Sequence, residues 1–207
     1  DNGCNIVCID ENTTQSIVQN VKKKAVTYAL NNKNADYTAE NITLEKNGCP
    51  TFDIFNKDRK VLSVSLNVAG DHNICNALGV TAACEFLGIE PEYIKSGLEE
   101  FRGAKRRFDR LGKTETGVDV VDDYAHHPTE IKTTLETAKK MGYNNVWVAF
   151  QPHTYTRTAA FLEQFASALK TADRVMITDI YPAREKYDGT MHACDLARLI
   201  PGVVYML

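Results

Sequence analysis

Two aspartates and two histidines lie within one short stretch of the chain, from Asp122 to Pro128. The stretch follows an apolar run at residues 118–121 and precedes a helical pattern that starts near Thr129, so it is predicted to connect a strand to a helix. In open α/β sheets, ligands bind at the carboxyl ends of the strands. The stretch is therefore the first candidate binding site of the chain.

Two later stretches follow predicted strands in the same way. Residues 151–158 include His153 and Arg157, and residues 179–186 include Arg184. Both come after short apolar runs that are typical of buried strands. Because the carboxyl ends of parallel strands meet at one edge of a sheet, the three polar loops are expected to converge on one crevice.

The aspartates of the first loop have two interpretations. Asp122 and Asp123 could cap the next helix. However, Pro128 and Thr129 already suit the start of a helix, so two aspartates exceed what capping requires. One of them could instead orient an arginine or bind a ribose or a metal-bound water.

The basic side chains of these loops indicate an anionic ligand. His126 and His127 are adjacent, so their side chains diverge, and no third ligand stands at a suitable spacing; contact with an anionic or amino-acid substrate is favoured over metal chelation, and no metal ligand is assigned. Arg157 lies in the first turn of a predicted helix, where the helix dipole disfavours a cation. We expect it to face an anion bound at that helix terminus, the alternative being a solvated surface arginine.

A second polar group opens a long helical pattern in the first half of the chain. Asn73 and Asn76 are three residues apart and share a helix face, and His72 precedes them. Two amides can present a donor and an acceptor to a purine edge. The alternative is a helix capped by Asp71 with solvated asparagines.

The elements that position these residues change in kind near residue 104. Before it, the pattern predicts helices at residues 11–21, 73–87 and 91–101, a strand at 24–30 and an antiparallel meander at 39–45, 51–56 and 60–66, with Gly88 ending the long helix. After it, strands at 118–121, 146–150, 175–178 and 203–207 alternate with helices at 129–140, 156–170 and 192–200. Alternation of this kind predicts an α/β fold with a doubly wound, mostly parallel sheet. The basic connector that contains Arg106 and Arg107 separates two predicted domains, residues 1–104 and 105–207, and its arginines could clamp a phosphate.

Composition bounds the function. The chain has 207 residues, 43% of them apolar, and a net charge of −3, which gives no electrostatic footprint for nucleic acid. It has no apolar run long enough for a membrane span and no signal peptide, so a cytoplasmic location is expected. The six cysteines include no paired motif. Cys4 and Cys8 lack a second pair at ligand-like spacing, so no zinc site is expected, and Cys75 and Cys84 fit small core positions. Free thiols are typical of a reducing compartment.

Four ordered motifs together resemble the Mur ligases. They are Gly70–Ala77 with the sequence GDHNICNA, Arg106–Asp109 (RRFD), Asp122–Ile131 (DDYAHHPTEI) and Phe150–Thr158 (FQPHTYTRT). The similarity is greatest to family members that join L-alanine to UDP-N-acetylmuramate. It implies ATP-dependent ligation through an acyl phosphate, during peptidoglycan synthesis. It also implies that residues 1–104 are the second half of a central ATPase domain and residues 105–207 a Rossmann-like C-terminal domain.

The resemblance also implies roles for single residues. His72, Asn73 and Asn76 match adenine-side residues, Arg107 matches a linker arginine that reaches the ATP phosphates, and Asp123 matches an aspartate that contacts the nucleotide. The remaining matches line the alanine and acyl-phosphate site, with His126 and Arg157 as catalytic candidates: Tyr124, His126, His153 and Arg157.

Two features depart from the family pattern. Thr154 stands where the family usually has an arginine, which shifts carboxylate binding toward Arg157 or Arg184. The chain contains no glycine-rich phosphate loop and starts at Asp1 without Met, so we expect a fragment, inactive alone, with most ligands of the Mg²⁺ that accompanies ATP outside it. The alternatives are a ligase that recycles a tripeptide onto the same UDP-muramic acid, and a stand-alone nucleotide-binding module.

Overall fold

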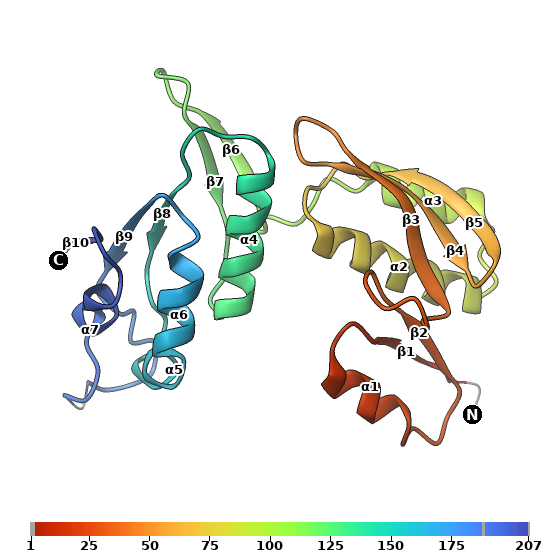
Figure 1. Cartoon of the computed structure of the whole chain (residues 1–207), viewed down its shortest axis with the longest axis horizontal. Coiled ribbons are helices and arrows are strands. Elements are labelled where there is room, and N and C mark those ends of the chain that lie inside the picture. Colours follow the sequence, from red (N-terminus) through yellow and green to blue (C-terminus); the bar gives the residue numbers. More distant parts are fainter. Residues whose placement is uncertain (1–2, 188, 207) are drawn as a thin grey trace. The chain divides into compact units, whose positions relative to one another are not determined.

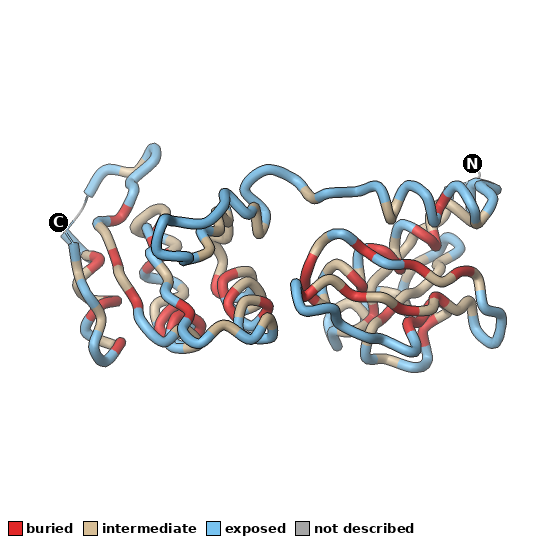
Figure 2. Tube along the Cα trace, turned by 90° about the horizontal axis from the view of Figure 1, so that it is seen from above, coloured by how far each residue is buried: buried red, intermediate tan, exposed pale blue. Residues whose placement is uncertain are grey.

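A computed structural model describes residues 3–187 and 189–206 of the chain, which divide into two compact units. Unit 1 ends at Gly103 and unit 2 begins at Ala104 (Figure 1). Buried residues gather along the strands and helices inside each unit, whereas the segment from Arg102 to Arg107 is almost entirely exposed (Figure 2). Each unit has its own hydrophobic core, and each is described separately below.

Unit 1 is built on a five-stranded mixed sheet with the order β1-β2-β3-β4-β5. The first three strands are parallel and the last two are antiparallel, as the predicted meander requires. The strands are β1 (Asn5–Cys8), β2 (Ala25–Tyr28), β3 (Tyr37–Leu44), β4 (Pro50–Asn56) and β5 (Arg59–Ser65). Alternation along β4 buries Phe52 and Ile54, which are 1% and 0% exposed and stabilise the core by about 1.5–3 kcal/mol each.

Helices cover the sheet of unit 1. They are α1 (Asn12–Val18), α2 (Asp71–Phe86) and α3 (Pro91–Glu100). The apolar side of α2 packs on β1, β2 and β3 through Ile74, Ala77 and Leu78, and α3 packs on β5. Gly88 ends α2 with a φ of +76°, as predicted. The prediction of Asp71 as N-cap is wrong, because Asp71 is the first helical residue and Gly70 is the N-cap.

Unit 2 contains an all-parallel sheet with the order β10-β9-β8, formed by β8 (Trp147–Phe150), β9 (Arg174–Thr178) and β10 (Val204–Met206). Its helices are α4 (Pro128–Lys140), α5 (Tyr155–Ala160), α6 (Leu162–Leu169) and α7 (Ala193–Arg198). The α/β class with a parallel sheet is therefore confirmed. The single helix predicted at residues 156–170 is wrong: it is broken at Phe161, whose φ of −119° is outside the helical range.

The strand before the first polar loop lies outside that parallel sheet. β7 (Asp119–Asp122) pairs antiparallel with β6 (Asp109–Lys113), a strand that the sequence pattern did not predict. Its valines explain the difference, since Val118 and Val120 are 58% and 40% exposed, whereas a central parallel strand is buried on both faces. A tight turn at Gly117, with a φ of +86°, closes the hairpin.

None of the helices within residues 3–187 and 189–206 has the length and apolar character that a membrane span requires.

Candidate active site

The first polar loop of unit 2 is fixed by the carboxylate of Asp123. One oxygen, Oδ2, accepts hydrogen bonds from the backbone N–H of Phe108 at 3.0 Å and from the hydroxyl of Thr134 at 3.0 Å. The other, Oδ1, accepts from the backbone N–H of Ala125 at 2.8 Å. Asp123 thus connects the end of β7 to the connector and to α4 by hydrogen bonds. This is a positioning role, and a contact with nucleotide would come in addition to it.

The carboxylate of Glu130 fixes the backbone of the two histidines of the loop. Its Oε2 accepts hydrogen bonds from the backbone N–H groups of His126 and His127 at 3.0 and 3.2 Å, which completes a capping box at the start of α4. Its Oε1 lies 3.3 Å from the guanidinium of Arg107. Burial acts to raise the pKa of Glu130, but hydrogen bonds from the His126 backbone and the Arg107 side chain outweigh it and lower the pKa below its usual value.

Arg106 braces the outer side of the same loop. Its Nε lies 3.2 Å from Oδ2 of Asp122, and its guanidinium lies over the ring of Tyr124, 4.6 Å from the ring centroid. Arg106 adopts a φ of +60°, which is uncommon for a residue other than glycine. Asp122 therefore has a local ion-pair partner, and Tyr124 is held at the exposed rim of the loop.

A row of four rings joins the three polar loops. The ring of His126 lies 5.6 Å from that of Tyr124 on its own loop and 6.4 Å from that of His153 on the second loop. His153 in turn lies 5.5 Å from Tyr181 on the third loop. The predicted convergence of the loops is therefore found, although β7 belongs to a different sheet from β8 and β9.

The two adjacent histidines separate, as expected. His126 joins the ring row, whereas His127 packs edge-on against Phe161 at 4.8 Å and accepts a hydrogen bond from the backbone of Thr129. The Nδ1 of His126 lies 3.0 Å from the carbonyl oxygen of Tyr124 and 3.6 Å from a Glu130 oxygen. Two acceptors near Nδ1 favour a proton on that nitrogen, which leaves Nε2 of His126 as a hydrogen-bond acceptor or base.

Backbone hydrogen bonds join the second and third loops beyond the ends of β8 and β9. The backbone N–H of Thr154 donates to the carbonyl of Tyr181 at 2.9 Å, and the N–H of Tyr181 donates to the carbonyl of Pro152 at 2.8 Å. These bonds continue the parallel pairing of β8 and β9 and fix the backbone on both sides of His153. Its Nδ1 is buried and has no hydrogen-bond partner among the described residues, which is unusual for a buried polar atom.

The N-terminus of α5 is occupied by a carboxylate of the chain itself. Glu185, from the third loop, accepts hydrogen bonds from the backbone N–H groups of Tyr155 at 2.5 Å and Thr156 at 3.1 Å, and from the Thr156 hydroxyl. The Thr156 hydroxyl, followed by those backbone groups, lowers the pKa of Glu185 below its usual value. The sequence led us to expect a ligand anion at this helix terminus, beside Arg157. That position is wrong, because Glu185 accepts the hydrogen bonds of the terminus.

Arg157 remains available for another anion. It is half-buried, and it forms no ion pair with the acidic residues that the structure describes. Thr154 precedes it as the N-cap of α5, and its hydroxyl accepts the backbone N–H of Arg157 at 3.4 Å. Thr154 has a φ of +69°, a strained conformation for a β-branched residue and one that is concentrated at functional sites. Arg184, the other candidate, is exposed on the third loop.

The candidate nucleotide residues of unit 1 lie in the first turns of α2. Asn73 donates from Nδ2 to the carbonyl of Ala69 at 2.8 Å, and its Oδ1 accepts from Nδ2 of Asn76 at 3.3 Å. The two amides therefore share one face, as predicted. His72 and Asn76 are exposed and Asn73 is half-buried.

A cavity in unit 1 is lined by other residues than these. It has a volume of about 470 Å³ and is bordered by Tyr37, Arg59, Glu85 and Phe86, among others. Its polar groups are mutually paired: the hydroxyl of Tyr37 donates to Glu85 at 2.8 Å, and Arg59 contacts the same carboxylate at 2.8 Å. We interpret this group as a structural network of the sheet and assign no chemistry to it.

Three residues that organise the site were not predicted from the sequence: Arg106, Glu130 and Glu185. A capping-box pattern was visible at Glu130, three residues after His127 and two after Pro128. The sequence pattern placed Arg106 in a basic connector as a possible phosphate clamp and did not indicate its contacts with Asp122 and Tyr124. Glu185 carried no local signal, because its partners lie about 30 residues away on another loop.

Comparison with known proteins matches each half of the chain to a family domain. The model of the Mur ligase middle domain matches residues 1–84, and the model of the Mur ligase glutamate ligase domain matches residues 106–204. The chain belongs to the Mur ligase family.

Three similar proteins are named as ligases of UDP-N-acetylmuramate and alanine. The UDP-N-acetylmuramate–L-alanine ligase of Acetivibrio thermocellus is 46% identical over 200 residues, which is 97% of this chain and 42% of that protein. The enzyme of the same name from Clostridium perfringens is 42% identical over 92% of this chain and 41% of its own length. The solved UDP-N-acetylmuramate-alanine ligase of Thermotoga maritima is 33% identical, with a TM-score of 0.69 over 87% of this chain and 39% of that one. The chain thus spans about two fifths of the length of these relatives.

Proposed function

We propose that the full-length protein that contains this chain joins L-alanine to UDP-N-acetylmuramate through an acyl phosphate, releasing ADP and phosphate. The observation that carries the proposal is the row of rings from Tyr124 to Tyr181, which gathers the loops that hold His126, His153 and Arg157. The names of the relatives at 42–46% identity support the choice of substrates.

In this proposal His126 and Arg157 act on the amino acid. The Nε2 of His126 accepts a proton from the amine of L-alanine, because Nδ1 is held toward the Tyr124 carbonyl. Arg157 is half-buried and lacks an acidic partner among the described residues, so it binds the alanine carboxylate or the developing oxyanion. Tyr124 and His153 line the same site.

ATP supplies the phosphoryl group that activates the carboxylate. His72, Asn73 and Asn76 would bind the adenine, and Arg107 would bind phosphate. Arg107 suits that task because its side chain is 52% exposed and its one ion pair with a described residue is to an oxygen of Glu130, so donors of the guanidinium remain for a second anion. Mg²⁺ accompanies ATP in this proposal, and we assign none of the residues of the three loops to it.

The test is phosphate release by the full-length protein with ATP, UDP-N-acetylmuramate and either L-alanine or a free tripeptide as the amino component. We expect release with L-alanine and a loss of at least about tenfold in kcat/KM for Arg157→Ala, on the scale of a removed charge-stabilising group. Arg198→Ala is the matched control, since that arginine pairs with Asp195 on α7 and should leave the rate unchanged.

Release with the tripeptide but not with L-alanine would instead identify the recycling ligase. Release with neither amino component, in a folded protein that binds ATP, would favour a nucleotide-binding module.

A further inference from the structure

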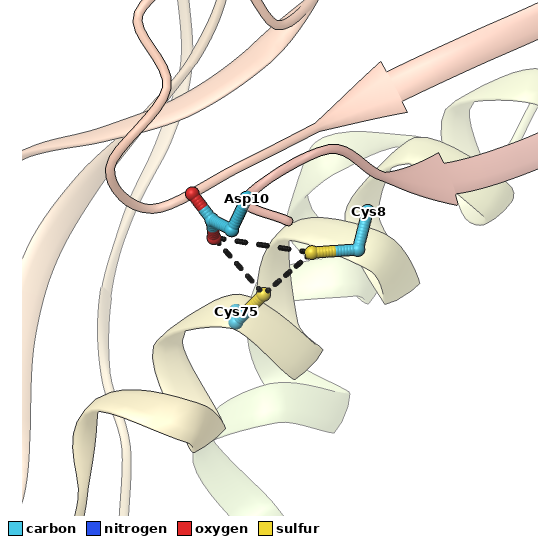
Figure 3. A group of neighbouring side chains, drawn as sticks. All are labelled: Cys8, Asp10 and Cys75. Carbon is cyan, nitrogen blue, oxygen red and sulfur yellow. Dashed lines mark hydrogen bonds between the residues drawn. The ribbon is translucent and has the colours of Figure 1, made fainter. Parts of the chain in front are cut away.

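Three potential metal ligands from two segments of unit 1 that are distant in sequence meet at the end of β1. Cys8 is the last residue of β1, Asp10 follows two residues later, and Cys75 lies in the second turn of α2. Their side chains point toward one another in Figure 3, and their ligand atoms all lie within 4.8 Å of one another. The two sulfur atoms are 3.5 Å apart, and Oδ2 of Asp10 lies 3.8 Å from Cys8 Sγ and 3.9 Å from Cys75 Sγ.

The carboxylate of Asp10 is fixed in this position by the backbone after β2. Oδ2 accepts the N–H of Leu30 at 2.8 Å, and Oδ1 accepts the N–H groups of Asn31 at 2.8 Å and Asn32 at 3.2 Å. These bonds prevent the carboxylate from turning away from the sulfur atoms. Hydrogen bonds that orient a ligand in this way are typical of metal sites.

The distances agree with the edges of a coordination tetrahedron. With Zn–S bonds of about 2.3 Å and Zn–O bonds of about 2.0–2.2 Å, tetrahedral geometry places two sulfurs about 3.8 Å apart and a sulfur and an oxygen about 3.5 Å apart. The observed separations, 3.5, 3.8 and 3.9 Å, differ from these edges by a few tenths of an ångström. Small side-chain shifts would therefore suffice for binding.

We propose that Cys8, Asp10 and Cys75 bind one divalent cation of the zinc class, with a water in the fourth position. Two sulfur ligands select Zn²⁺ over Mg²⁺ or Ca²⁺, which prefer oxygen. Binding takes both cysteines as thiolates and releases their protons to solvent. The cation would fasten the end of β1 to the first turns of α2, between Asn73 and Asn76.

A disulfide between Cys8 and Cys75 is the competing interpretation. An S–S bond of about 2.05 Å would require the sulfurs to approach by roughly 1.5 Å from their separation of 3.5 Å. A disulfide would also leave unexplained why three backbone donors hold a carboxylate against both sulfur atoms. The metal site uses all three groups without an oxidant.

The test is a Co²⁺ titration of the fully reduced 207-residue chain. We expect one equivalent to produce the near-ultraviolet thiolate-to-cobalt band and the visible bands of tetrahedral Co²⁺, and Zn²⁺ to abolish both. Cys8→Ser and Cys75→Ser should each lose the thiolate band or halve it, with binding weakened at least about tenfold. Cys84→Ser is the matched control, because it lies on the same helix nine residues on, about two and a half turns away and on the opposite face.

A measurement on the unaltered chain guards against variants that fail to fold. Zn²⁺ should protect Cys8 and Cys75, but not Cys194, against alkylation, as read by mass spectrometry. The proposal is overturned if the reduced wild-type chain shows no thiolate band, if the band is unchanged in both serine variants, or if Zn²⁺ protects neither cysteine. Formation of a Cys8–Cys75 disulfide by a reduced chain that does not bind Co²⁺ would establish the competing interpretation.

Discussion

Removal of the Asp123 carboxylate should loosen the first polar loop of unit 2. Asp123→Ala leaves the backbone N–H groups of Phe108 and Ala125 and the hydroxyl of Thr134 without their acceptor. A hydrogen bond contributes about 0.5–1.5 kcal/mol net, and bonds to a charged group contribute more. Because Asp123 is half-exposed and water can replace part of the loss, we expect about 2 kcal/mol.

The assay is native-state hydrogen exchange read by mass spectrometry. A change of about 2 kcal/mol corresponds to roughly a 30-fold loss of protection for peptides that cover residues 105–127. Peptides of unit 1 provide the internal control. Asp122→Ala is the matched variant: it removes an ion pair with Arg106 whose side chains are 59% and 37% exposed, so it should cost only about 0–1 kcal/mol.

Unchanged protection in Asp123→Ala would refute the positioning role. If the same variant raised the KM for ATP in the full-length enzyme while protection stayed at the wild-type level, Asp123 would act on the nucleotide alone. An equal loss in Asp122→Ala would show that the loop responds to any lost charge, and the three hydrogen bonds would not explain its order.

Three further predictions concern other parts of the chain. Glu185→Gln should speed exchange of the first N–H groups of α5 and lower kcat/KM for L-alanine in the full-length enzyme about tenfold or more, because α5 carries Arg157; equal kinetics would contradict this. Arg107→Ala should lower turnover at least about tenfold as a lost phosphate clamp, and unchanged kinetics would remove it from the site. Tyr37→Phe should destabilise unit 1 by about 1–2 kcal/mol in urea unfolding, because Glu85 loses a buried donor. Burial acts to raise the pKa of Glu85, but hydrogen bonds from Arg59 and Tyr37 lower it below 4.5. The stability that ionised Glu85 contributes is therefore complete above pH 4.5 and is lost as the pH falls below that value. An acid unfolding transition that Tyr37→Phe leaves unaltered would count against this network.

Local patterns predicted the elements that depend on local chemistry. Alternation along β4 and the turn residues around it predicted the meander, and Gly88 predicted the end of α2, because a positive φ has a strong sequence preference. The break at Phe161 was not predicted, since the periodicity on either side of it is helical and no glycine or proline marks it. The pairing of β7 with β6 was also missed, because strand partners depend on burial that one strand does not reveal.

The candidate site shows the same division. Spacing alone placed His126, His153 and Arg157 on loops that follow strands, and the ring contacts of His126 and His153 place their loops together. Spacing did not reveal that Asp123 is used to hold its loop, or that Glu185 occupies the terminus of α5. Both roles depend on partners distant in sequence, which become neighbours only when the chain folds.

The sequence by itself determined the residue types, the order of most elements and the four motifs of a Mur ligase. Only the tertiary structure decided which side chains are free to act: it gives Glu185 to the helix terminus and leaves Arg157 without an acidic partner among the described residues. It also brings the sulfur of Cys75 within 3.5 Å of that of Cys8, 67 residues earlier in the chain. Helix periods and strand alternation act over a few residues, whereas the partner of a charge or a thiol is set by packing between elements.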